Sequence, residues 1–307
     1  MPVLTSAPRL RPAALTALAL VALLAVPTAA QAAPTHHPAH ARTASAPAQR
    51  HVTHPITTTT VPASPSLGFG GGTIFAPADT GRAVLGSVIV TPGFTDTQAG
   101  MRWYGTDLAA EGFVVLTIDT LDPDRYDTPE ARATQMLAAA DYLTGESAVR
   151  SVVSKDRVGL LGFSMGGGGV LQAAQSRPSI KAAVALMPFD FSSDPDGGAP
   201  GYPRLTTPAL VVSAQADDLA DPTLMVKPMY DSIPKGTPKQ YLQLRGAGHQ
   251  AGQTTPNGTI RVAATAFLKR YLDGNGAYGK FICPAPAVTP TGPISESTST
   301  CVDSRRR

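Results

Sequence analysis

The sequence predicts an α/β fold: a mainly parallel, doubly wound sheet with helices on both faces. Short apolar runs with the length and composition of buried strands recur along the chain, at residues 83–90, 113–118, 157–161, 182–186, 209–212 and 240–244. Segments with helical character lie between several of these runs, and strands that alternate with helices form parallel sheets. Such a sheet carries its functional residues at the carboxyl ends of its strands.

The elements in the first half of the chain follow in order. A glycine-rich turn and a short apolar run at 68–74 predict an edge strand. Met101, Tyr104 and Leu108 recur at helical spacing and predict a helix after the first long strand. Residues 129–143 are rich in good helix formers and predict a second helix.

The second half continues the alternation. The strand at 157–161 runs into a glycine-rich turn and a further helix. We expect 240–244 to be the last strand and 261–272 to be the helix that closes the pattern. The chain that remains is enough for one core and leaves little for a separate domain, so we expect no lid or cap domain.

The N-terminus has the three-part layout of a secretory signal peptide. Arg9 and Arg11 precede the apolar run 13–26, and a small-x-small cleavage site follows at 30–32. The run is too short and too weakly flanked for a stable membrane span. We therefore predict a signal peptide at 1–32 and a secreted protein without stable membrane insertion.

Residues 33–66 are rich in Pro, Ala, Thr and His and have no apolar period, which predicts a disordered linker. A catalytic domain at 67–302 and a basic tail at 303–307 complete the predicted organisation. A metal site in the linker is the alternative to a solvated tail, but no Cys or carboxylate accompanies its histidines. Five of the chain's six histidines lie there: His36, His37, His40, His51 and His54.

Charge and cysteine content narrow the function further. The net charge is +3, and no basic stripe with interleaved aromatic residues is present, so we expect no nucleic-acid partner. Cys283 and Cys301 are the two cysteines. An oxidising compartment favours a disulfide between them, and two free thiols are the alternative.

The sequence Gly162-Phe163-Ser164-Met165-Gly166 stands at the turn after the strand at 157–161. It fits G-x-S-x-G, the nucleophile elbow of α/β-hydrolases, in which a Ser is exposed on a sharp strand-to-helix turn. Small flanking residues are needed because side chains there would collide with the neighbouring strand and helix. A glycine-rich turn that happens to contain a Ser is the alternative interpretation.

A nucleophilic Ser needs a base, and the base needs an acid that orients it. His249 is the one histidine of the predicted domain, and it follows the strand at 240–244, as the order Ser, acid, His requires. Asp217, Asp218 and Asp221 all follow the strand at 209–212. We favour Asp217 by spacing, with Asp218 next and Asp221 last; turn or cap roles are the alternative for each.

The oxyanion of an acyl-transfer reaction needs two backbone donors. We expect the N–H of Met165, directly after the Ser, to be one of them. Phe94, in the loop after the strand at 83–90, fits the other. No cofactor is needed for this chemistry.

Several segments together resemble the actinobacterial cutinase and lipase family that includes the polyester hydrolases acting on poly(ethylene terephthalate), or PET. The resemblance runs from about residue 66 to Cys301. It implies a lidless α/β-hydrolase that cleaves carboxylic esters. We also expect the protein to be a monomer. The resemblance also implies Ser164 as nucleophile, Asp217 as acid, His249 as base, Phe94 and Met165 at the oxyanion hole, and Cys283 paired with Cys301. The segments that carry it are 68–74, 92–98, 162–169, 269–270 and 281–284.

The departures from this family concern the substrate cleft. Phe94 stands where the family usually has Tyr, Phe163 where it has His or Trp, Phe189 where it has Trp, and Leu219 where Ile is common. The cleft stays apolar but loses polar groups and the broad indole face. These departures favour simple acyl esters over aromatic polyesters.

Thermophilic members of the family bind calcium through acidic residues. The matching positions here are Gln215 and Arg245, which are poor calcium ligands, so we expect no metal.

The sequence thus predicts a serine hydrolase acting on ester or polyester substrates such as cutin or PET. An amide hydrolase and an inactive secreted binding protein are the alternatives. A dienelactone hydrolase fits less well, because that class uses Cys as nucleophile.

Overall fold

A computed structural model describes residues 53–81, 83–122, 128–191 and 200–301. All of these belong to one compact unit, Arg50–Arg307. The predicted signal peptide (1–32), the linker up to residue 52 and the basic tail at 303–307 lie outside the described residues. Among the helices described, none is long and apolar enough to cross a membrane.

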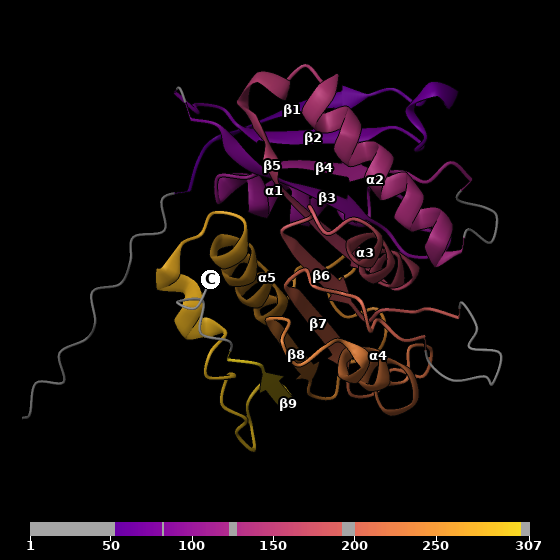
Figure 1. Ribbon diagram of the computed structural model, residues 1–307, viewed down its shortest axis with the longest axis vertical. Helices are drawn as coiled ribbons and strands as arrows, with labels where there is room; N and C mark the ends of the chain where they lie inside the picture. The colour runs from indigo at the N-terminus through magenta and orange to yellow at the C-terminus, as the bar shows by residue number, and fades with distance from the viewer. Residues whose placement is uncertain (1–52, 82, 123–127, 192–199, 302–307) are drawn as a thin grey trace, which may run out of the picture. The chain divides into compact units, whose positions relative to one another are not determined.

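The described chain forms one sheet of nine strands in the order β1-β2-β4-β3-β5-β6-β7-β8-β9 (Figure 1). The six strands from β4 to β8 in this order are parallel, whereas β1, β2 and β9 join antiparallel. The prediction of a mainly parallel sheet is therefore confirmed. The strands are β1 Ile56–Val61, β2 Gly72–Pro77, β3 Leu85–Thr91, β4 Val114–Ile118, β5 Val153–Phe163, β6 Ala182–Leu186, β7 Ala209–Ala214, β8 Lys239–Leu244 and β9 Ile294–Ser299.

Helices cover both faces of the sheet, as the alternation predicts. One apolar cluster packs α2 (Pro129–Gly145), α3 (Met165–Ser176) and α4 (Lys227–Ser232) on one face. A second cluster packs α1 (Arg102–Ala110) and α5 (Gly258–Tyr271) on the other (Figure 1). The central strands contribute to both clusters because both of their faces are buried, which explains their continuous apolar runs.

Short helical turns complete the elements: η1 Pro65–Leu67, η2 Arg150–Val152, η3 Pro222–Val226 and η4 Gly276–Phe281. Within the described ranges no connection between strands carries a separate cap domain.

Two sequence predictions about the edges of the sheet are wrong. The strand β1 lies inside 33–66, which we predicted to be disordered, so the ordered chain begins before residue 67. The strand β9 follows β8, which we predicted to be the last. Both are edge strands with largely exposed or half-buried side chains, so neither has the apolar pattern by which a buried strand is recognised. Because β1 forms the edge, the strand β2, which we expected there, lies one place inside it.

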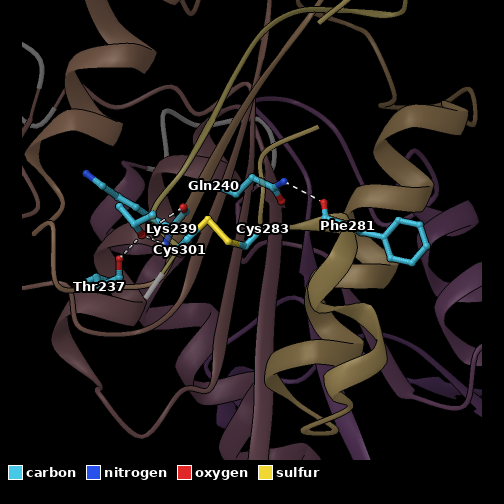
Figure 2. Close-up of a disulfide and its surroundings, with 7 residues drawn as sticks. Thr237, Lys239, Gln240, Phe281, Cys283 and Cys301 are labelled. Atoms are coloured by element: carbon cyan, nitrogen blue, oxygen red, sulfur yellow. Dashed lines mark hydrogen bonds between the residues drawn. A yellow bond between two sulfur atoms is a disulfide. The ribbon is translucent and has the colours of Figure 1, made fainter. Parts of the chain in front are cut away.

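A disulfide between Cys283, which follows η4, and Cys301, which follows β9, closes the C-terminal segment (Figure 2). Beside it, the Oγ1 of Thr300 accepts the Lys239 N–H at 2.8 Å and donates to the Thr237 carbonyl at 2.8 Å. The side chain of Gln240 donates to the Phe281 carbonyl at 3.2 Å (Figure 2). Closing a loop with a separation of 18 residues contributes roughly 3 kcal/mol in the chain-entropy model.

Candidate active site

Ser164 stands between the end of β5 and the start of α3, with φ of 53° and ψ of −120°. A positive φ is strained for a residue with a side chain, so the surroundings must hold it. The Ser164 N–H donates to the Leu186 carbonyl at 2.9 Å. Its own carbonyl accepts from Gly168 at 3.0 Å and from Phe189 at 2.9 Å. These bonds fix the elbow from both sides.

The glycines around Ser164 are required by space. A Cβ on Gly162 would come within 2.2 Å of the Gly166 carbonyl oxygen. A Cβ on Gly166 would come within 2.5 Å of the Pro92 oxygen and 2.6 Å of the Thr91 oxygen. The first turn of α3 is therefore packed directly on β5 and on the loop after β3.

His249 lies in the loop after β8 and reaches back over the sheet to Ser164. Its Nε2 is 2.9 Å from the Ser164 Oγ, and its Nδ1 is 2.8 Å from Oδ2 of Asp217. A carboxylate only accepts, so the proton sits on Nδ1 and leaves Nε2 as the acceptor for the Ser hydroxyl. The imidazole is buried and packs against the ring of Phe163, with 5.1 Å between ring centroids.

Of the three aspartates after β7, the structure brings Asp217 to His249. The other carboxylate oxygen of Asp217 accepts from the N–H groups of Leu219 at 3.0 Å and Ala220 at 2.8 Å. Asp218 is exposed. Asp221 is the N-cap of η3, where it accepts two backbone N–H groups.

Met165 begins α3, so its N–H belongs to the unpaired N-terminal donors of that helix. Phe94 follows Gly93, and a Cβ on Gly93 would lie 3.1 Å from the Cβ of Ser164. The backbone around Phe94 therefore passes directly beside the Ser, as an oxyanion-hole donor requires. The loop is anchored by Arg132 of α2, which is fully buried and donates to the Pro92 carbonyl at 2.9 Å.

Sequence reasoning did not single out Arg132. Its place within the predicted helix at 129–143 could have indicated a structural role, because an Arg on a buried helix face needs a specific acceptor.

The predicted cleft residues differ in exposure. Phe94 is 44% and Leu219 57% exposed, so both can contact a substrate. Phe189 is half-buried. Phe163 is 2% exposed and packs against His249. It therefore supports the imidazole and offers almost no surface to a substrate.

The residues at the calcium positions of the resembled family have other partners. Arg245 donates to the carbonyls of Gly292, Thr289 and Ile294, and the Gln215 side chain accepts from Gly246. Within the described ranges, no group of three or more His, Cys, Asp or Glu side chains could hold a metal.

The fold agrees with a comparison to known families. Residues 29–302 match the family model described as PET hydrolase-like. The chain belongs to the PET hydrolase-like family. The resemblance inferred from the sequence motifs is thereby confirmed, and this PET hydrolase-like chain is a hydrolase of the carboxylesterase class.

Curated relatives of the PET hydrolase-like chain align over most of its length. A bis(hydroxyethyl) terephthalate hydrolase of Streptomyces coelicolor is 41% identical over 246 residues, which are 80% of this chain and 76% of the relative. A cutinase of Thermobifida alba is 40% identical over 236 residues, 76% of this chain and 75% of the relative. A cutinase of Thermobifida fusca is 39% identical over 236 residues, 76% of this chain and 70% of the relative.

Proposed function

We propose that this protein hydrolyses carboxylic esters through an acyl-enzyme formed on Ser164. The observation that carries the proposal is the hydrogen-bonded arrangement at the elbow. The hydroxyl of Ser164, whose backbone has a strained positive φ, lies 2.9 Å from one imidazole nitrogen of His249. The buried carboxylate of Asp217 lies 2.8 Å from the other imidazole nitrogen. A structural role for these three residues would not require a serine in a strained, positive-φ conformation.

The proposed reaction proceeds in two halves. His249 accepts the proton of Ser164 as the hydroxyl oxygen attacks the ester carbonyl. The N–H groups of Met165 and Phe94 stabilise the oxyanion, and the imidazolium then protonates the leaving alcohol. A water molecule, deprotonated by His249, attacks the acyl-enzyme and releases the acid. Asp217 holds the imidazole in the required tautomer and stabilises its cation.

The rim of the site supports neutral, apolar acyl esters as substrates. Phe94 and Leu219 present exposed apolar side chains beside the catalytic residues. The names of the relatives extend the proposal to cutin-like polyesters and to hydroxyethyl esters of terephthalic acid. Because Phe stands where the family usually has Tyr or Trp, we expect small soluble esters to be cleaved faster than solid aromatic polyester.

Hydrolysis of p-nitrophenyl butyrate and palmitate by the wild-type protein and by Ser164→Ala tests the proposal. We expect turnover that disappears in the variant, together with fluorophosphonate labelling of the wild type only. The butyrate rate relative to the palmitate rate then places the enzyme between cutinases and lipases. A folded wild type that cleaves p-nitroanilides but no esters would instead support an amide hydrolase. A folded wild type that cleaves neither substrate class and is not labelled by the fluorophosphonate would support a binding protein.

We also propose that the enzyme is exported. The signal-peptide layout of residues 1–32 and the Cys283–Cys301 disulfide support this. N-terminal sequencing of protein recovered from the culture medium is expected to begin at residue 33. A full-length chain that stays inside the cells would contradict export.

A further inference from the structure

Two loops must meet with the correct spacing for the proposed site to work. The loop after β3 carries the Phe94 N–H, and the loop after β8 carries His249. Their strands are separated in the sheet by β5, β6 and β7. Hydrogen bonds between these strands therefore do not set the distance between the two loops. A direct contact between the loops is one way to set it.

Asp96 and Gln253 supply such a contact. The Gln253 side-chain N–H donates to Oδ2 of Asp96 at 2.6 Å, over a sequence separation of 157 residues. A hydrogen bond to an ionised carboxylate is stronger than one between neutral groups. It joins a residue two positions after Phe94 to a residue four positions after His249.

Both ends of this contact are themselves fixed. The Asp96 carboxylate packs against Gly100, where a Cβ would lie within 2.4 Å of Oδ2. At the other end, the Gln253 carbonyl accepts the indole N–H of Trp103 at 2.7 Å. The preceding carbonyl, of Gly252, accepts the Tyr104 hydroxyl at 2.7 Å. The turn after His249 is thus held on α1 through its backbone and on the Phe94 loop through one side chain.

We propose that Asp96 and Gln253 are positioning residues that hold the His249 loop against the loop of the oxyanion hole. This inference rests on the proposed ester hydrolysis, because it concerns the spacing between the base and one oxyanion donor. Neither side chain touches the reacting atoms. Loss of the contact lets the imidazole and the Phe94 N–H drift relative to each other, which slows the chemical steps and leaves ground-state binding intact.

The test uses Asp96→Ala, Gln253→Ala, the double variant and Asp96→Asn, with Thr97→Ala and Thr254→Ala as controls on exposed neighbouring positions. With p-nitrophenyl butyrate we expect kcat to fall about three- to tenfold in both single variants, at unchanged KM. The double variant is expected to be no slower than the slower single variant, because one contact is lost in each case. Asp96→Asn retains an acceptor oxygen and is expected to regain most of kcat. The controls are expected to match the wild type.

A second readout does not depend on catalysis. Trp103 is the only tryptophan of the chain and is 9% exposed. The hydrogen bonds connect Asp96 to Trp103 through Gln253. We therefore expect Asp96→Ala to increase quenching of Trp103 fluorescence by acrylamide, although Asp96 makes no direct hydrogen bond to Trp103.

The two readouts separate the failure of this inference from the failure of the proposed function. A wild type without esterase activity would contradict the proposed function. Acrylamide quenching of Trp103 fluorescence would still report on the contact between the loops. Additive losses in the double variant, or single variants equal to the controls in kcat and in quenching, overturn the positioning role. A loss that appears in KM alone also overturns it.

Discussion

At the scale of single residues, Asp217 differs from Asp218 and Asp221 in what its oxygens accept. One oxygen receives two backbone N–H groups, and the other receives the Nδ1–H of His249. The two backbone donors hold the carboxylate in the orientation that meets the imidazole. Its side chain is fully buried, so water does not compete for the imidazole.

We predict that Asp217→Asn lowers kcat roughly 10³–10⁴-fold, because an amide at this position favours the wrong imidazole tautomer. The matched change Asp218→Asn removes an equal charge one residue away, at an exposed position, and is expected to leave the rate unchanged. Esterase assays on both variants give the comparison. Equal losses in the two would show that charge near the site, and not orientation of His249, sets the rate.

The same residues show how far sequence reasoning reached. The elbow motif selected Ser164, chain order and the single histidine outside the linker selected His249, and spacing favoured Asp217 over its two neighbours. The Asp96–Gln253 contact and the Arg132–Pro92 bond could not be predicted. They join residues 157 and 40 positions apart in the chain. No local pattern encodes which loops meet above a sheet.

At the scale of elements, the elbow depends on α3 starting directly against β5 and the loop after β3. Backbone atoms surround Gly166, and backbone cannot move aside as a side chain can. The glycines that the sequence displays at 166–169 are therefore a consequence of packing around the first turn of α3.

We predict that Gly166→Ala destabilises the protein by roughly 1–3 kcal/mol through overpacking and reduces esterase activity, because the Ala methyl group would displace the loop that carries Phe94. Gly145→Ala is the matched control at the end of α2, where a Cβ meets no atom within 4 Å. There the same change is expected to stabilise by about 0.4–1 kcal/mol. Urea denaturation of both variants measures the difference. A Gly166→Ala protein as stable and active as the wild type would contradict the packing argument.

Elements were predicted best where they are buried. The six parallel strands and five helices that enclose the core have apolar patterns, and most of them were located from sequence. The two strands that were missed, β1 and β9, are the two edges of the sheet. β1 is a Thr run, in which β-branched side chains stabilise a strand but give no apolar alternation. Composition alone made it resemble a flexible linker.

At the scale of the whole molecule, buried tyrosines in both layers determine how stability depends on alkaline pH. Burial raises the pKa of Tyr104 on α1, and burial together with the nearby Asp190 carboxylate raises that of Tyr202, both well above 10.0. Burial raises the pKa of Tyr230 on α4 to about 12. Tyr202 also donates to Asp190 at 2.6 Å, so its proton holds a buried carboxylate.

The sign of the effect follows from proton binding. In the unfolded chain these phenols lose their protons near their ordinary value of 10.0, whereas the folded chain keeps them to higher pH. Their contribution to stability is therefore complete below pH 10 and is lost as pH rises through the folded pKa values. Lys239 acts in the opposite direction below its ordinary value of 10.5, because burial lowers its pKa. The tyrosine effect is thus clearest above that pH.

We predict that the free energy of unfolding falls between pH 10.5 and pH 12, with each such tyrosine adding a slope of at most about 1.4 kcal/mol per pH unit. Tyr230→Phe removes one titrating group, so its slope in this range should be shallower than that of the wild type. Urea denaturation at closely spaced pH values, with phenolate absorbance followed in parallel, measures both. A wild-type stability that stays level up to pH 12 would mean that the folded and unfolded chains release these protons together. The tyrosines would then not be buried as the two apolar clusters require.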